Sequence, residues 1–346
     1  NANENATARS GVRRPMNADA PLAVFRADAG STIGWGHVMR CSALATALNN
    51  VGWRCAWATA SDNAAMTARL AERFDEVVVL ATDQDEVTQM RAHWRAGCRL
   101  FVLDHYERDA GYASSCRGWA DTILAIDDLA ERAHDCDFLL DMAPGGSADD
   151  YRGCVPDNAL CLLGPAYALL MPGFAATRQR LLPRNYDGAA KRVLLGLGAT
   201  NPKGVLDKVL DAIEQASLRL APDLVLAWNT PDGERLAARA ERAGGRVHVD
   251  VDNMAELMAN ADIAVGAGGM SSWERCTLGL PTLLLVIADN QRANAEALAA
   301  AGAARIVKPE TNALVEAINA LAGDSAALER MSRAASRLAD GIGAIR

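Results

Sequence analysis

The sequence of 346 residues lacks two features that would each mark a class of protein. Its longest apolar stretch, residues 281–288, falls far short of the roughly 18 residues of a membrane-spanning helix and is typical of a buried strand. No cluster of lysine and arginine is interleaved with aromatic residues, and the net charge is −8. We therefore expect neither a membrane nor a nucleic acid as a partner. A small anionic ligand is compatible with this charge, because helix N-termini bind phosphate without a basic surface.

Cysteine pairs and metal-ligand spacings are also missing. None of the eight cysteines forms a Cys-x-x-Cys pair and several lie in apolar segments, which predicts reduced core thiols in a cytoplasmic protein. His93, His134 and His248 show no ligand spacing with one another or with a cysteine, so we expect no metal site and no cofactor. Residues 1–20 lack the apolar core of a signal peptide, and we expect them to form a flexible tail.

What the sequence does contain is a repeated alternation of apolar strands and amphipathic helices. We expect strands at residues 22–25, 54–59, 76–80, 100–104, 122–127 and 138–141, and again at 192–197, 224–228, 246–249, 263–265 and 282–287. The helices between them are expected at residues 63–74, 86–96, 205–217, 232–243 and 254–259. Apolar strands separated by helices are typical of parallel sheets covered on both faces. The fold class is therefore α/β, with two Rossmann-like domains whose parallel sheets face each other across a cleft.

Turn-forming residues suggest the domain boundaries. We predict a catalytic domain over residues 21–182, a linker over 183–190, a nucleotide-binding domain over 191–324, and a C-terminal helix over 325–346 that packs back on the first domain. Residues 142–185, rich in proline, glycine and alanine, are interpreted as a connecting segment.

A glycine-rich turn and a helix follow the first strand. Gly34 and Gly36 allow a tight turn and the close approach of a ligand, and His37 falls on the first turn of the helix. Free N–H groups at that end favour a neutral imidazole, which can accept a proton near pH 7. Arg40 follows one turn later on the same face. His37 is thus a candidate general base, and a capping role is the alternative.

A second glycine-rich turn covers residues 266–274. Its small residues expose several N–H groups where a helix begins, which would suit a diphosphate, and Glu274 lies close enough to accept hydrogen bonds from a ribose diol. The alternative is a tight turn with a capping serine and a solvated glutamate.

Further polar residues end other predicted strands. Asp289-Asn-Gln291 offers amides suited to sugar hydroxyl or N-acetyl groups, or else caps the next helix. Asp104-His-Tyr106 and Asp127-Asp128 either contact substrate or hold loops.

Together these residues resemble the UDP-sugar hydrolases of pseudaminic acid biosynthesis. The similarity spans residues 22–346 in the family's order. The motifs are Arg26-x-Asp28, Ile33-Gly-x-Gly-His-Val-Met-Arg-Cys41, Asp104-His-Tyr106, Asp127-Asp-Leu129, Leu163-Gly-Pro-x-Tyr-Ala-Leu-Leu170 with Phe174, Ala267-Gly-Gly269 with Trp273-Glu274, Asp289-Asn-Gln291 and Asp340-Gly-x-Gly-Ala344.

The resemblance implies a GT-B-like pair of domains related to glycosyltransferases such as MurG. It also implies hydrolysis of UDP-2,4-diacetamido-2,4,6-trideoxy-β-L-altrose to UDP and free sugar, with His37 as the catalytic residue. The family's glycine loop and glutamate fall on Gly268, Gly269 and Glu274, and the asparagine of its Asp-Asn-Gln motif falls on Asn290. From their places in these motifs and loops we expect further residues to contact the nucleotide or the sugar. The nucleotide group adds Gly198, Met270 and Ser271, and the substrate group comprises Arg26, Asp28, Gly34, Gly36, Arg40, Tyr106, Asn290 and Gln291.

The sequence departs from this family at two loops. Gly198-Ala-Thr-Asn-Pro202 stands where the family usually has Gly-Gly-Ser/Thr-Asp-Pro, and Gly266 and Met270 stand where it usually has serines. These changes concern contacts with the diphosphate and the sugar.

We expect a monomer that acts on a small UDP-sugar by water attack at C1 with inversion. Two other functions share these features, a GT-B glycosyltransferase that moves the sugar to an acceptor and a nucleotide-sugar binding protein without catalysis.

Overall fold

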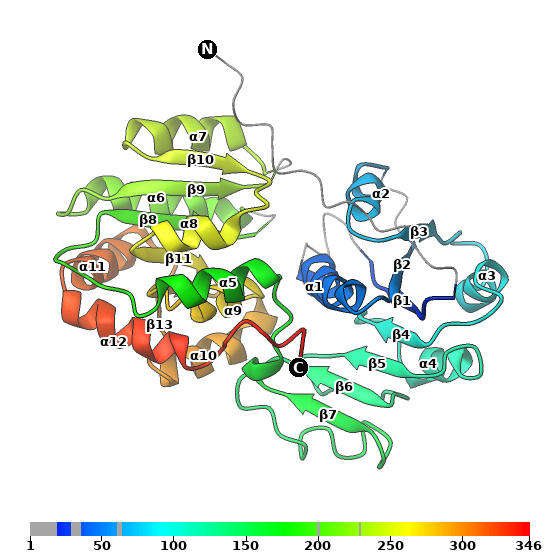
Figure 1. Cartoon of the computed structure of the whole chain (residues 1–346). Coiled ribbons are helices and arrows are strands. Elements are labelled where there is room, and N and C mark those ends of the chain that lie inside the picture. The colour runs from blue at the N-terminus through cyan, green and yellow to red at the C-terminus, as the bar shows by residue number, and fades with distance from the viewer. Residues whose placement is uncertain (1–18, 29–35, 61–63, 199–200, 228–229) are drawn as a thin grey trace.

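The computed structural model describes residues 19–28, 36–60, 64–198, 201–227 and 230–346, which form two α/β domains (Figure 1). In the described part of the first domain, seven parallel strands form a sheet in the order β3-β2-β1-β4-β5-β6-β7. These strands are β1 (Leu22–Arg26), β2 (Arg54–Thr59), β3 (Glu76–Val79), β4 (Leu100–Leu103), β5 (Ile123–Ile126), β6 (Phe138–Asp141) and β7 (Leu160–Leu163). The helices are α1 (Gly36–Asn50), α2 (Ala64–Ala71), α3 (Glu86–His93), α4 (Ala110–Cys116) and α5 (Pro172–Leu181), with a 3-10 turn η1 (Pro165–Tyr167).

The second domain repeats this plan. Its described residues form a sheet of six parallel strands in the order β10-β9-β8-β11-β12-β13. The strands are β8 (Arg192–Gly196), β9 (Ala221–Leu226), β10 (Arg246–Val249), β11 (Ile263–Ala267), β12 (Thr282–Leu285) and β13 (Ala304–Ile306). The helices are α6 (Val205–Gln215), α7 (Gly233–Arg242), α8 (Met254–Asn260), α9 (Ser271–Thr277), α10 (Arg292–Ala300), α11 (Thr311–Ala322) and α12 (Ser325–Ser336), with 3-10 turns η2 (Pro202–Gly204) and η3 (Asp289–Gln291).

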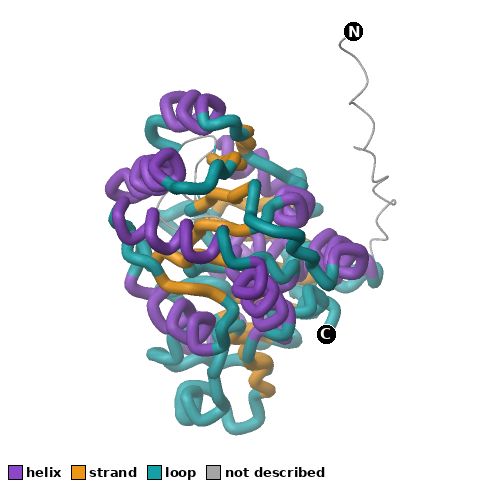
Figure 2. The backbone as a smooth tube through the Cα atoms, turned by 90° about the vertical axis from the view of Figure 1, so that its left-hand side faces the viewer, coloured by secondary structure: helices purple, strands orange, loops and turns teal. Residues whose placement is uncertain are grey.

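Both sheets are buried between helices, which explains why their strands are apolar without alternation. Figure 2 shows strands with helices on either side. One hydrophobic cluster fills the second domain and another covers one face of the first sheet. A third cluster runs through both domains, from Phe25 and Trp57 to Leu280 and Leu284. The predicted fold class is therefore confirmed, and all of the expected strands are present within a few residues.

The segment interpreted as a connection, residues 142–185, contains a strand and a helix that were not expected, β7 and α5. β7 is a four-residue edge strand whose first residue, Leu160, is 55% exposed, so it gives a weak apolar signal. α5 begins at Pro172, which is tolerated in the first turn of a helix because its missing N–H would have no partner there. Proline and glycine thus mark the start of a helix here rather than a loop.

α5 packs against α8 and α9 of the second domain, beside which it lies in Figure 1. Arg178 on α5 donates to the carbonyls of Thr277, Ser336 and Ala339. The C-terminal residues return to η1, where Arg346 donates to the carbonyl of Ala166. Where the two domains divide along the chain stays a prediction.

All eight cysteines are unpaired, and six of them are buried. None of the helices in the described ranges combines the length and the hydropathy that crossing a bilayer requires.

Candidate active site

A cavity of about 680 Å³ is lined by residues of both domains. Its first wall comes from the start of α1 and from the loops that follow β4 and β5, including Tyr106 and Asp128. Its second wall comes from the carboxyl ends of β8, β9 and β11, the loop before α9, and η3. Ligands of parallel α/β sheets bind at this edge, where the strand order reverses. The reversals lie between β1 and β4 in one sheet and between β8 and β11 in the other.

Strand pairing brings His37 to a partner far away in the sequence. β1 and β4 are parallel neighbours, with Arg26 beside Leu103. The chain leaves β1 toward α1, and it leaves β4 directly into Asp104. Because both carboxyl ends lie at one edge, the first turn of α1 meets the Asp104 carboxylate.

His37, Arg40 and Asp104 form a buried cluster beside the cavity. Nδ1 of His37 lies 2.6 Å from Oδ1 of Asp104, and Nε of Arg40 donates to Oδ2 at 2.6 Å. Nη2 of Arg40 donates to Oδ1 as well. A carboxylate oxygen only accepts, so Nδ1 of His37 carries the hydrogen of this pair. No described residue bonds Nε2, which leaves that nitrogen of a neutral ring as an acceptor.

The charge of Asp104 is held by its partners. Burial by itself raises the pKa of this carboxyl group, but the charge of Arg40 and the contact with His37 outweigh it and place the pKa well below its usual range. Asp104 is 1% exposed and does not line the cavity. It therefore orients His37 and cannot contact substrate in this arrangement.

Tyr106 and Asp128 extend this wall of the cavity. The rings of His37 and Tyr106 meet edge to face with centroids 5.2 Å apart. The Tyr106 hydroxyl donates to Oδ2 of Asp128 at 3.1 Å, and Nη1 of Arg40 lies 3.7 Å from the same oxygen. Both residues line the cavity, so a hydroxyl and a carboxylate face the space next to His37.

The second wall is the glycine-rich loop of the other domain. Gly268, Gly269, Met270 and Ser271 line the cavity where α9 begins, and Gly198 lines it at the end of β8. The predicted nucleotide residues are thus brought together.

Polar side chains behind this loop fix its backbone. Oε1 of Gln291 accepts from the N–H groups of Gly268 and Ile287, both at 3.3 Å. Nδ2 of Asn294 donates to the carbonyl of Gly268 at 2.5 Å. Gln291 therefore supports the loop, while Asn290 is exposed at the cavity.

Glu274 lies on the first turn of α9 and lines the cavity. Burial raises the pKa of its carboxyl group to about 7, and the charge of Arg275 only partly offsets this effect. Near pH 7 the free protein thus holds both protonated and ionised forms of this residue.

Two predicted substrate residues do not line the cavity. Arg26 is fully buried and pairs with Asp28 at 2.6 Å and with Glu86 at 2.8 Å. Asp28 also accepts from Nε2 of His105 at 2.8 Å. This network supports the end of β1 from inside the domain. Gly34 lies outside the described residues, and Gly36 lines the cavity.

Four further residues shape the site, of which Asp104 and Asp128 were expected to contact substrate or to hold loops, and Arg275 and Asn294 were not predicted. Asp104, Asp128, Arg275 and Asn294 complete the geometry described above. Two of them carried a signal, since Asp104 and Asp128 follow strand ends. Arg275 and Asn294 lie inside helices at positions that only the packing distinguishes.

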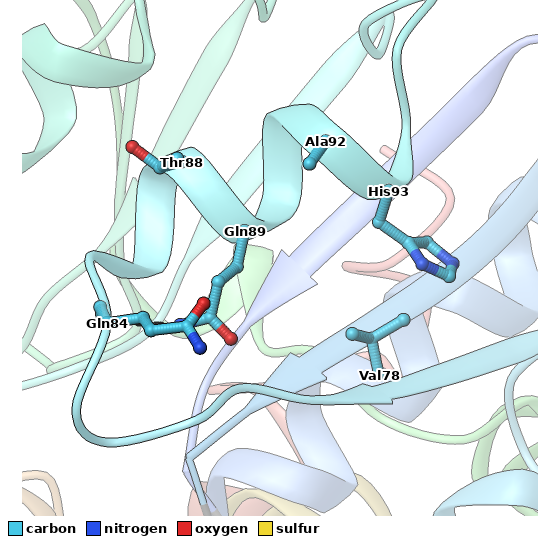
Figure 3. A pocket seen from close by; sticks show the side chains of 6 residues that line it. All are labelled: Val78, Gln84, Thr88, Gln89, Ala92 and His93. Carbon is cyan, nitrogen blue, oxygen red and sulfur yellow. Dashed lines mark hydrogen bonds between the residues drawn. The ribbon is translucent and has the colours of Figure 1, made fainter.

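A second hollow lies outside the cavity, between α3 and β3 (Figure 3). Gln89 there donates to the carbonyl of Ala81 and accepts from its N–H, and His93 contacts Glu76 at 2.6 Å. The side chains of Gln89 and His93 are thus paired with other groups of the protein. The part of the chain that the structure describes contains no group of three or more histidine, cysteine or acidic residues that could hold a metal ion.

Two parallel-sheet α/β domains around a shared cavity define a GT-B fold. The crystal structure of Acinetobacter baumannii MurG superposes with a TM-score of 0.64 at 16% identity, covering 94% of this chain and 97% of that one. Residues 247–344 match the glycosyltransferase family 28 C-terminal domain.

Among curated relatives, the spore coat polysaccharide biosynthesis protein SpsG of Bacillus subtilis is 28% identical over 80% of this chain and 81% of its own length. The UDP-2,4-diacetamido-2,4,6-trideoxy-beta-L-altropyranose hydrolase of Campylobacter jejuni is 22% identical over 68% of this chain and 80% of its own. The chain is therefore homologous to UDP-sugar hydrolases and to glycosyltransferases of the GT-B fold.

Proposed function

We propose that this protein hydrolyses a UDP-linked sugar to UDP and the free sugar. One observation carries the proposal: the imidazole of His37, held through Nδ1 by the buried Asp104, lines a cavity whose opposite wall is a glycine loop suited to a diphosphate. A hydrolase needs a base for water at this position, and a transferase that inverts C1 needs one for the acceptor hydroxyl, so the test below separates the two reactions. His37 supplies that base.

In the proposed reaction, Nε2 of His37 takes a proton from a water molecule as the water oxygen attacks C1 of the sugar. The C1–O bond to the diphosphate breaks, and its electron pair leaves with UDP. Asp104 accepts the hydrogen bond from Nδ1–H and stabilises the imidazolium that forms. Attack from the side opposite to the leaving group inverts C1.

The glycine loop acts on the leaving group. UDP is a good leaving group, so the N–H groups of residues 268–271 need only stabilise the negative charge that develops on the diphosphate. Glu274 would accept hydrogen bonds from the ribose diol. Positioning of the water and of C1 contributes as much as proton removal.

For the sugar we propose a 2,4-diacetamido-2,4,6-trideoxy hexose, the group named for the Campylobacter relative. Tyr106, Asp128 and Asn290 line the cavity and supply hydroxyl, carboxylate and amide groups for hydroxyl and acetamido substituents. We propose a monomer, since both walls of the cavity come from one chain.

The direct test is turnover of this UDP-sugar in ¹⁸O-labelled water without an acceptor. We expect free sugar with the label at C1, unlabelled UDP, and an inverted anomer in the first NMR spectra. UDP binding without turnover on a panel of diacetamido sugars would contradict the proposal and favour a binding protein.

Two variants test the roles of the residues. His37→Asn should lower kcat by about 10²- to 10⁴-fold and leave UDP affinity unchanged. Asp104→Asn should lower kcat and also lower stability, by about 3–5 kcal/mol, because Arg40 loses its buried carboxylate. A His37 variant with near-wild-type hydrolysis would overturn the assignment.

A GT-B glycosyltransferase is the second candidate, favoured by the match of residues 247–344 to the glycosyltransferase family 28 C-terminal domain. It predicts sugar release that is slow in water alone and at least tenfold faster when an acceptor is supplied. Labelled free sugar formed at full rate without an acceptor would exclude it.

A further inference from the structure

Arg275 is a buried cation with no carboxylate partner among the described residues. It lies on α9, is 4% exposed, and lines the cavity behind the glycine loop. Long side chains on a helix point back toward its N-terminus, which here carries the guanidinium toward the loop. A positive charge is therefore placed at the end of the cavity assigned to the nucleotide.

Neutral groups hold this guanidinium. Nη2 donates to the carbonyl of Ala267 at 2.6 Å and to Oγ of Ser272 at 3.1 Å, and Nη1 donates to Oγ of Ser271 at 2.9 Å. Nε is buried without a hydrogen-bond partner. By contrast, all three nitrogens of Arg184 in the predicted linker donate to main-chain carbonyls.

Gly266 provides the space for Arg275. A Cβ atom at Gly266 would lie 2.6 Å from Nη1 of Arg275 and 3.2 Å from the carbonyl oxygen of Gly196. Any side chain at residue 266 would therefore displace the guanidinium. Gly266 is the last residue but one of β11, and Gly196 is the last residue of β8. The strand order reverses between these two strands. The charge thus lies where ligands of such sheets bind.

The energetics of burial point to an anion. A buried charge without an opposite charge destabilises the folded protein, and hydroxyl groups compensate for it only in part. Burial accordingly lowers the pKa of Arg275 to about 10. The adjacent Glu274 makes no ion pair with it, because successive helical side chains point in different directions. A bound diphosphate would supply the missing charge.

We propose that Arg275 is a binding residue for the diphosphate of the nucleotide, and that Gly266 is required because it leaves room for this guanidinium. The inference rests on the proposed function for placing a UDP-sugar in this cavity. Arg275 would add a positive charge to a glycine loop whose N–H groups are the other proposed contacts with the diphosphate. Ser271 and Ser272 accept hydrogen bonds from the guanidinium and hold it in place. Ser272 in turn donates to the carbonyl of Ala267, whereas Ser271 lines the cavity.

The test is calorimetric titration of the full chain with UDP, uridine and inorganic pyrophosphate. Arg275→Met keeps the length and apolar volume of the side chain. We expect it to weaken UDP and pyrophosphate binding by about 10- to 100-fold and to change uridine binding by less than about twofold. Unchanged UDP affinity, or an equal loss for uridine, would overturn the inference in favour of a structural role.

Two further variants keep a positive charge near the loop. Gly266→Ala displaces the Arg275 guanidinium and should weaken UDP and pyrophosphate binding without changing uridine binding. Arg275→Lys should bind UDP more tightly than Arg275→Met and less tightly than wild type. Arg184→Met is the control, since it removes an arginine of the predicted linker that lies outside the cavity and whose three nitrogens donate to main-chain carbonyls. It should lower thermal stability and leave the ratio of UDP to uridine affinity unchanged. These variants decide the question even if Arg275→Met fails to fold.

Hydrolysis measured on the same samples separates this inference from the proposed function. Arginine-dependent UDP binding without any hydrolysis supports the inference and refutes the hydrolase. Normal hydrolysis and UDP binding in Arg275→Met refute the inference and leave the hydrolase intact. Wild-type protein that binds neither UDP nor pyrophosphate refutes both.

Discussion

At the scale of single residues, the site depends on charges taken out of water. Asp104 is almost fully buried and keeps its charge because Arg40 and His37 surround it. Removing one member of such a group leaves the others uncompensated, so the cluster is fixed in both geometry and charge. The general base that we propose requires this rigidity, because its imidazole must present the same nitrogen to each water molecule.

Glu274 predicts a pH dependence of nucleoside binding. Its pKa is raised by burial from 4.5 to about 7, so the free protein must release a proton before the carboxylate can accept hydrogen bonds from the ribose diol. Uridine affinity should therefore rise about tenfold between pH 6 and pH 8, as the ionised fraction goes from about one tenth to nine tenths. Uridine is the appropriate ligand because it carries no phosphate that titrates in this range.

Glu274→Gln is the control for this titration and should give a flat profile. A raised pKa also means that ionising the carboxyl costs stability as pH rises from 4.5 through 7, so the same variant should melt higher than wild type at pH 8. Wild-type uridine affinity that stays constant from pH 6 to pH 8 would contradict the role given to Glu274.

At the scale of elements, short segments are held in place by close backbone contacts. The C-terminal segment passes η1 and α5 with no space for side chains. A Cβ at Gly343 would lie 2.4 Å from the carbonyl oxygen of Ala168, and one at Gly341 would lie 3.2 Å from the N atom of Ala175. The end of the chain is thereby attached to the segment between β7 and α5.

We predict that Gly343→Ala lowers the free energy of unfolding by about 1–3 kcal/mol, because the backbone of η1 cannot move away without disturbing α5. The midpoint of urea denaturation measures this change. Gly173→Ala on α5 is the matched control, since an added Cβ there meets nothing within 4 Å. It should leave stability unchanged or raise it by about 0.4–1 kcal/mol. Equal midpoints for the two variants would show that the contact at Gly343 is not restrictive.

At the scale of the whole molecule, polar contacts join the two domains at the edge of the cavity. Nη2 of Arg69 on α2 lies 2.5 Å from Asp250 after β10, and Arg73 lies 3.6 Å from Asp252. All four residues line the cavity. On the other side, Arg180 pairs with Glu256. These partly exposed pairs contribute little to folding, but they favour the closed arrangement of the cavity.

We predict that Asp250→Asn combined with Asp252→Asn raises KM for the UDP-sugar by about two- to fivefold with stability changed by less than about 1 kcal/mol. The reason is that the closed form becomes a smaller fraction of the free protein. Steady-state kinetics and the radius of gyration from X-ray scattering measure the effect. Asp149→Asn, which breaks an exposed pair with Arg152 outside the cavity, is the control. Unchanged KM and radius of gyration in the double variant would exclude a role in closure.

The sequence by itself determined the α/β class, most strands, and the two glycine-rich turns that are candidates for the site. Apolar runs without alternation that are separated by helices are typical of strands buried in parallel sheets, and glycines before a helix expose its N–H groups, so these features follow from local pattern. The placement of His37 at the first turn of α1 also follows from its spacing after Gly36.

Only the tertiary structure decided which side chains meet. Strand order places Asp104 against His37, buries Arg26 away from the cavity, and brings Arg275 into the space beside Gly266. The local sequence around each of these residues does not depend on which strands are neighbours in the sheet. Pairing between distant strands is set by the packing of the whole sheet, and for that reason local sequence could name His37 and the glycine loop as candidates but not their partners.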